Sequence, residues 1–117
     1  MSRTLYIRVS AREDALDRFE AAWHLATARA PARLDVISFA ELGLLLRHLT
    51  PARWQLLARL RAEGPLSVRA LAKRLGRDYK NVHTDVARLA DLGLIARGDD
   101  GRVAVPWDAV RAELRLA

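Results

Sequence analysis

The chain has 117 residues, of which 51% are apolar, and carries a net charge of +6. This length and apolar content suit one globular domain with a hydrophobic core and exclude a disordered chain. The absence of cysteine excludes disulfides and thiolate metal sites. No apolar run reaches the roughly 18–20 residues that cross a bilayer, and no export signal opens the chain, so we expect a cytoplasmic protein with no membrane partner.

Residues 1–37 are predicted to form a strand–helix arm. The β-forming residues of Thr4–Val9 predict a short strand. Ser10 and Glu13 then have the spacing of a capping box, which predicts a helix to about residue 30, where Pro31 stops it. The apolar, β-branched stretch 34–39 predicts a second strand.

Residues 38–117 are predicted to form a second unit made of helices and one hairpin. A second capping-box pair, Ser38 and Glu41, predicts a helix through residue 49. Other capping residues and terminating glycines predict four more helices, over 50–64, 67–75, 78–92 and 108–116. In the helix 50–64, the residues predicted to face inward are Trp54, Leu57, Ala58 and Leu60. Residues 94–96 and 103–105 are predicted to pair as a hairpin around a glycine-bearing turn.

This order of elements predicts a mainly α fold with small β content, a winged helix-turn-helix preceded by the strand–helix arm. On the helix 78–92, Val82, Val86 and Leu89 fall within about 40° of one another and should face the core. The opposite side carries polar groups that match base edges. Such a helix enters the major groove of DNA through its N-terminal half.

The predicted DNA contacts divide into two kinds. Lys80 and Asn81 are the first candidates for base contacts, because lysine favours guanine acceptors and asparagine can pair bidentately with adenine; Thr84 and His83 come next. Contacts to phosphates, which fix register without reading sequence, are predicted for the groups that flank the short helix, namely Ser67, Arg69, Lys73, Arg74 and Arg77. The Tyr79 hydroxyl is a further phosphate candidate, with its ring against the turn, and Arg88 flanks the polar face of the recognition helix. Arg97 and Arg102 flank the hairpin turn, where a wing would contact the DNA backbone or the minor groove.

Each assignment has a structural alternative. Lys80 and Arg88 could be solvated helix charges. Arg97 and Arg102 could be neighbours of the turn residues Asp99 and Asp100.

Two segments carry a resemblance to a known group of proteins. They are Gly64-Pro65-Leu66-Ser67-Val68-Arg69-Ala70-Leu71-Ala72 and Gly76-Arg77-Asp78-Tyr79-Lys80-Asn81-Val82-His83-Thr84-Asp85-Val86. With residues 49–54 they resemble small prokaryotic transcriptional regulators with a MarR-like winged helix-turn-helix, often the antitoxin of a toxin–antitoxin module. The resemblance extends over about residues 38–107. It implies a repressor, in one form an autoregulating antitoxin whose arm binds a toxin protein.

Small helix-turn-helix proteins usually bind palindromic operators in double-stranded DNA as two-fold dimers. Apolar residues beyond the needs of the winged domain are predicted to form a homodimer interface: Leu5, Ile7, Leu16, Phe19, Trp23, Leu42 and Leu45. The strand 5–9 would pair across chains or onto residues 35–38, and the alternative is an arm that packs on its own domain.

No enzyme, metal or cofactor site is predicted, because the three histidines lie on different helices without acidic partners at ligand spacing. The rival function is a winged-helix protein-interaction module with weak or no DNA binding.

Overall fold

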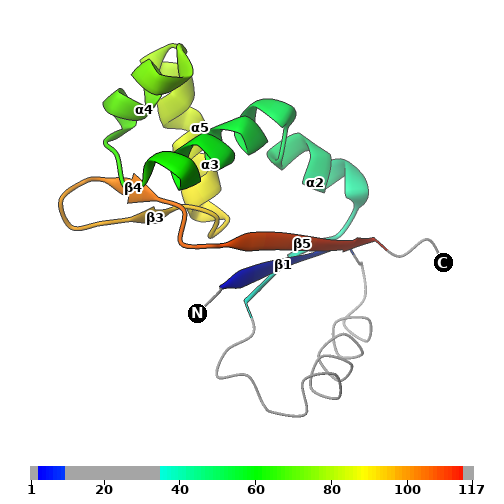
Figure 1. Cartoon of the computed structure of the whole chain (residues 1–117). Helices are drawn as coiled ribbons and strands as arrows, with labels where there is room; N and C mark the ends of the chain where they lie inside the picture. Colours follow the sequence, from blue (N-terminus) through cyan, green and yellow to red (C-terminus); the bar gives the residue numbers. More distant parts are fainter. Residues whose placement is uncertain (1–2, 10–34, 115–117) are drawn as a thin grey trace.

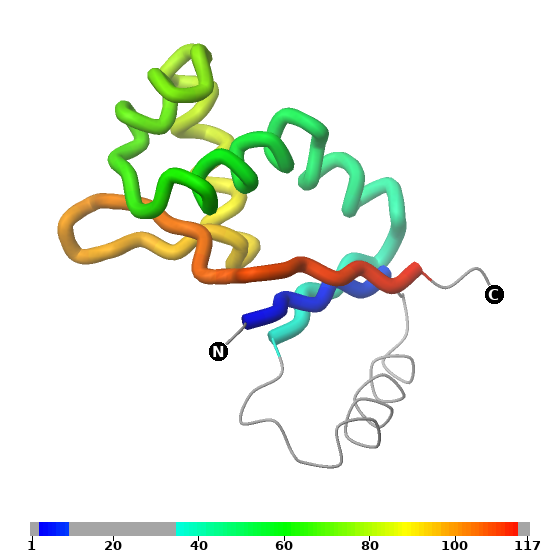
Figure 2. The backbone as a smooth tube through the Cα atoms, in the orientation of Figure 1, coloured from blue at the N-terminus to red at the C-terminus, as the bar shows by residue number. Residues whose placement is uncertain are grey.

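A three-stranded parallel sheet supports the helices of the molecule (Figure 1). The computed structural model describes residues 3–9 and 35–114. Strand β1 (Thr4–Val9) lies at the centre of the sheet, between β2 (Val36–Phe39) and β5 (Ala109–Leu114). The first and last described strands are therefore neighbours, as the chain path in Figure 2 also shows. The described part of the chain is a small α/β domain.

The register of the sheet places one row of apolar side chains toward the helices. Ile7 of β1 is in register with Ile37 of β2 and with Ala112 of β5. Because side chains alternate along a strand, Leu5 and Ile7 point to the same face, and both are buried in the core. Of the two alternatives for the strand 5–9, pairing within the chain onto residues 36–39 is the one observed.

Four helices are described: α2 (Leu42–His48), α3 (Pro51–Glu63), α4 (Val68–Leu75) and α5 (Tyr79–Asp91). Three start at predicted caps. The side chains of Thr50, Ser67 and Asp78 each accept a hydrogen bond from the backbone N–H three residues later, at 3.1 to 3.3 Å. These bonds satisfy amide groups that have no partner within the helix.

The predicted hairpin is confirmed. Strands β3 (Ala96–Arg97) and β4 (Val103–Ala104) pair antiparallel, and the turn is closed by a hydrogen bond from Gly98 N to Arg102 O at 2.8 Å. Val103 also exchanges two backbone hydrogen bonds with Leu66, the residue before the cap of α4. The hairpin is thus fixed directly to the start of the short helix.

One hydrophobic core runs through both predicted units. It contains residues from the sheet, from every described helix and from the hairpin, among them Leu5, Ile7, Leu56, Leu71, Val86 and Val103. The predicted boundary between residues 37 and 38 falls inside β2.

The prediction of a final helix over residues 108–116 is wrong, because residues 109–114 form β5, parallel to β1 along its whole length. Asp108 does not cap a helix: its carboxylate accepts a hydrogen bond from Arg3 N at 2.7 Å and pairs with Arg61. Pairing with a strand from the other end of the chain outweighs the helix propensity of this segment, which is high because alanine, arginine, glutamate and leucine all favour helices.

The helix after β2 begins three residues later than the predicted capping box implies. Ser38 and Phe39 belong to β2, and Glu41 is itself the N-cap residue of α2, with no side-chain capping bond. On α3, the inward face is also shifted. Leu56, Leu57 and Leu60 are buried, whereas Trp54 and Ala58 are exposed beside β5.

Candidate functional site

A tight turn joins α4 to α5 and fixes the angle between them. Gly76 adopts the left-handed conformation (φ 64°, ψ 34°), and its N–H donates to carbonyl groups in the last turn of α4. Arg77 N donates to Ala72 O at 3.1 Å. These bonds satisfy the carbonyl groups that the helix end leaves open, and glycine adopts this conformation without the steric cost of a Cβ.

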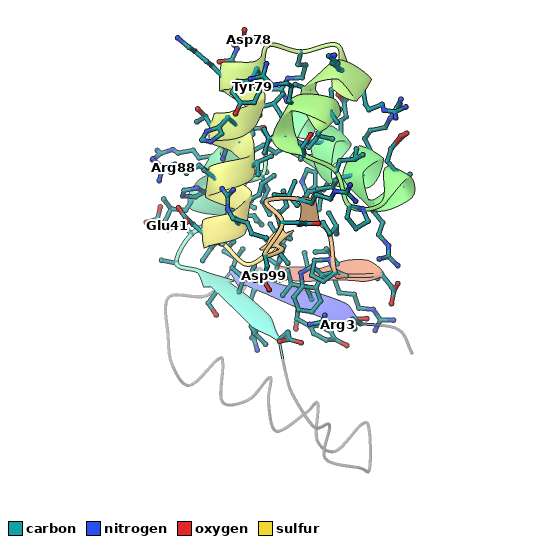
Figure 3. The ribbon with its side chains drawn as sticks, turned by 90° about the vertical axis from the view of Figure 1, so that its left-hand side faces the viewer. Arg3, Glu41, Asp78, Tyr79, Arg88 and Asp99 are labelled. Carbon is teal, nitrogen blue, oxygen red and sulfur yellow. The ribbon has the colours of Figure 1, made fainter. Side chains whose placement is uncertain are left out.

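The two faces of α5 have the predicted character. Val82, Val86 and Leu89 are all 0% exposed, so the predicted inward face is confirmed. The outer side carries the exposed polar residues Lys80, Asn81, His83, Thr84 and Arg88. Asp78 and Tyr79 lie at the end of α5 that is farthest from the sheet, and Arg88 projects from the side of the helix (Figure 3). The polar surface is therefore held on a rigid helix by a fully buried apolar face.

An aromatic stack joins α4 to α5 across this surface. The Arg69 guanidinium lies over the Tyr79 ring, with Cζ 4.7 Å from the ring centroid. The rings of Tyr79 and His83 are also in contact, with their centroids 5.8 Å apart and their planes tilted by 46°. A guanidinium over an aromatic face is attracted by the electron density of the ring. The Tyr79 ring thus contacts side chains of both helices.

The hydroxyl group of Thr84 donates a hydrogen bond within α5. Its Oγ1 donates to Lys80 O at 3.0 Å, one turn back along α5. In this conformation Thr84 offers a ligand only oxygen lone pairs and a methyl group. The exposed side chains that can donate on this half of the helix are therefore those of Tyr79, Lys80, Asn81 and His83.

The basic residues of α4 and the hairpin are exposed and weakly held. Arg74 lies 3.8 Å from Glu63, and Arg102 lies 3.7 Å from Asp100 with both side chains 63% exposed. Lys73 and Arg97 are also exposed. Surface ion pairs of this kind contribute about 0–1 kcal/mol, so an incoming anion can replace the carboxylate partner. The alternative interpretation is confirmed to the extent that Arg102 lies next to Asp100. Because both side chains are exposed, Arg102 can still contact an anion in solution.

Arg77 differs from these residues because it belongs to an internal cluster. Its Nη2 donates to Asp85 Oδ2 at 2.8 Å, and its Nη1 is buried without a hydrogen-bond partner. Arg53 Nε donates to the other carboxylate oxygen of Asp85 at 3.0 Å, and Arg53 Nη1 donates to His48 O at 2.7 Å. We call Arg53, Arg77 and Asp85 the Asp85 cluster. It ties the turn and α5 to the start of α3.

Sequence reasoning missed Arg53 entirely. Arg53 and Asp85 are 32 residues apart, on different helices, and no local pattern links them. The sequence signal was an acidic residue, Asp85, within a segment that is basic on balance, which is consistent with a carboxylate that holds arginines.

A protein-family model named HVO_A0114 matches residues 48–112, more than half of the chain. The chain belongs to the HVO_A0114 family. The match covers α3, α4, α5 and the hairpin and ends within β5. No curated protein and no solved structure matches this HVO_A0114 protein. The family name states no activity, so the resemblance to MarR-like regulators stays a prediction.

The predicted dimer residues of this HVO_A0114 protein have different environments. Leu5, Ile7 and Leu45 are buried in the core of their own chain, whereas Leu42 is 45% exposed. Leu16, Phe19 and Trp23 lie outside the described residues. Of the predicted interface, Leu42 is the residue that the described surface offers to a partner.

The described residues form neither a metal site nor a membrane-spanning helix. Within residues 3–9 and 35–114, no three histidine or acidic side chains come together as metal ligands would. No helix in the same ranges combines the length and apolar content that crossing a membrane requires.

Proposed function

We propose that this protein is a sequence-specific DNA-binding transcriptional regulator with a winged helix-turn-helix fold, which inserts α5 into the major groove. The observation that carries the proposal is the polarity of α5. Three apolar residues are wholly buried on one side, and Lys80 and Asn81 are exposed on the N-terminal half of the other. Recognition helices present their N-terminal residues to base edges.

The exposed groups on α5 have the chemistry of base contacts. The Lys80 ammonium matches the O6 and N7 acceptors of guanine, and the Asn81 amide can donate to and accept from adenine. Thr84, whose proton is held by Lys80 O, matches a thymine methyl group or a base donor. These three residues are the proposed readers of sequence.

The cations around them have the arrangement of phosphate contacts. Arg69, Lys73 and Arg74 lie on α4, Arg88 on α5, and Arg97 and Arg102 in the hairpin. Contacts of this kind set the position of a protein on a duplex and supply most of its salt-dependent affinity. Arg77 has a different proposed role: its ion pair with Asp85 makes it a positioning residue for the turn.

The hairpin supports the proposal through its attachment. Because Val103 pairs with Leu66 just before the cap of α4, β3 and β4 stand beside the short helix at a fixed position. A wing held in this way would contact the DNA backbone or the minor groove next to the site of α5. A repressor that binds a palindromic operator as a homodimer fits this geometry, and toxin binding remains an implication of the MarR-like resemblance.

The test is a selection of DNA from a random library, followed by fluorescence anisotropy with the enriched sequence over a range of salt concentrations. The K80A and N81A variants should each lose about 1–3 kcal/mol of specific affinity and relax the preference at one base position. The matched control is R59A, which removes an exposed cation from α3.

Two results would contradict the proposal. If no sequence is enriched and no complex forms even at low salt, the protein is an interaction module of the rival class. If K80A and N81A bind the selected DNA as tightly as R59A, the readers of sequence lie elsewhere.

A further inference from the structure

β5 forms one edge of the described sheet. β5 is paired on one side with β1, and in the described part of the chain no strand pairs with its other side. Residues 111–114 are all exposed, including the apolar Leu114. An unpaired strand edge presents backbone N–H and C=O groups that bind another strand readily, and proteins usually protect such an edge.

The sequence of β5 is suited to pairing with itself. Around Ala112 the residues are symmetric in character: an arginine and a glutamate at 111 and 113, and apolar side chains at 110 and 114. In an antiparallel pair centred on Ala112, each Arg111 lies opposite the partner's Glu113. Each Val110 then lies opposite the partner's Leu114. Opposite charges and apolar pairs directly across two strands stabilise their pairing.

The apolar and the charged side chains of β5 lie on opposite faces of the sheet. Val110, Ala112 and Leu114 are in register with Leu5, Ile7 and Val9, the side of the sheet that packs against the helices. Arg111 and Glu113 lie on the opposite face. The apolar pairs would therefore extend the core, and the charged pairs would form outside it.

A groove beside the edge has room for an apolar side chain. It has a volume of about 260 Å³ and lies between α3 and β5, with Trp54, Leu57 and Ala58 on one side and Ala109 and Val110 on the other. Trp54 is 39% exposed. The partner's Leu114, opposite Val110, would lie next to this groove and cover Trp54. This accounts for two apolar side chains that the chain itself leaves exposed.

We propose that two copies of this chain join antiparallel through β5, so that two three-stranded sheets become one six-stranded sheet. The inference does not depend on DNA binding. The sheet lies at the other end of the molecule from Asp78 and Tyr79, so the joined pair would leave the N-terminal half of each α5 accessible (Figure 3).

The test is the oligomeric state of the full chain, measured by sedimentation equilibrium over a wide concentration range. R111E places two glutamates opposite each other in both charged pairs, and we expect it to weaken dimerisation about tenfold or more. R111E combined with E113Q removes this repulsion and should recover most of the affinity. The substitution at 113 is to glutamine and not to a cation, because a cation there would lie beside the buried Arg8, which is in register with this position.

R59E, which makes the same charge change on the exposed side of α3, is the matched control and should dimerise like the wild type. L114K tests the apolar pair independently and gives a second measurement if R111E does not fold by circular dichroism. A monomeric wild type would overturn the proposal. A dimer that R111E and L114K leave unchanged would also overturn it, because the copies would then meet at another surface.

Discussion

Replacing Asp85 by alanine should destabilise the protein much more than replacing an exposed acid on the same helix. The Asp85 carboxylate is 14% exposed and accepts hydrogen bonds from two guanidinium groups, those of Arg53 (15% exposed) and Arg77 (30% exposed). Without Asp85, two largely buried cations would face each other with no anion between them.

The expected loss follows from these partners. A hydrogen bond to a charged group contributes about 1.5–3 kcal/mol, and breaking a fully buried ion pair costs about 3–5 kcal/mol. Arg77 is partly exposed and can turn its guanidinium toward water, which lowers the cost. We therefore expect D85A to lower the free energy of unfolding by about 2–4 kcal/mol. D85N keeps one acceptor oxygen but leaves both cations without an anion and points an amide donor at one of them, so it should lose nearly as much.

Urea unfolding followed by circular dichroism measures this difference. Domains of this size have about 5–15 kcal/mol of stability, so D85A should still fold. D91A is the matched control: Asp91 is exposed at the C-terminal end of α5, where a negative charge opposes the helix dipole, and its removal should be neutral or slightly stabilising. A loss for D85A within 0.5 kcal/mol of D91A would refute the assigned role of the Asp85 cluster.

Three further predictions concern other single features. K73A should weaken binding to all DNA sequences alike and reduce the slope of log affinity against log salt by about 0.9, measured by anisotropy; an unchanged slope would exclude a phosphate contact. G76A should lower the free energy of unfolding by about 1–2 kcal/mol, measured in urea, because residue 76 has a left-handed φ. G43A, on α2 with open space around it, should raise the free energy of unfolding by up to about 1 kcal/mol. Equal effects of the two substitutions would contradict this reasoning. W107F should lose about 0.5–1.5 kcal/mol in the same assay, because the indole N–H donates to Gly93 O at 2.9 Å, and wild-type stability would show that this bond contributes nothing.

The helical part of the fold was predictable because its signals are local. The caps at Ser67 and Asp78 act within three residues, and the left-handed Gly76 ends its own helix. The inward face of α5 follows from helical periodicity alone, since Val82 and Val86 are one turn apart. Each of these features is decided by neighbours in the sequence.

The final strand was not predictable in this way. Val110, Ala112 and Leu114 alternate with Arg111 and Glu113, a period that suits a strand as well as a short helix. What decides the outcome is β1, more than 100 residues earlier, as the bond from Arg3 N to Asp108 across 105 positions illustrates. Local propensity gives way to tertiary pairing where the two disagree.

The candidate site shows the same division between local and distant interactions. Exposure of the residues on α5 follows from helical periodicity, but which of the surrounding arginines can meet a phosphate depends on contacts between helices. Arg69 is held over Tyr79 by an aromatic contact that a duplex need not break, whereas Arg77 would have to leave a desolvated carboxylate. The energy of breaking that ion pair exceeds what one phosphate contact returns in salt-screened water. The proposed DNA site therefore has one cation fewer than the sequence implies, because Arg77 is paired with Asp85. Through this ion pair Arg77 instead fixes the position of the turn relative to α5.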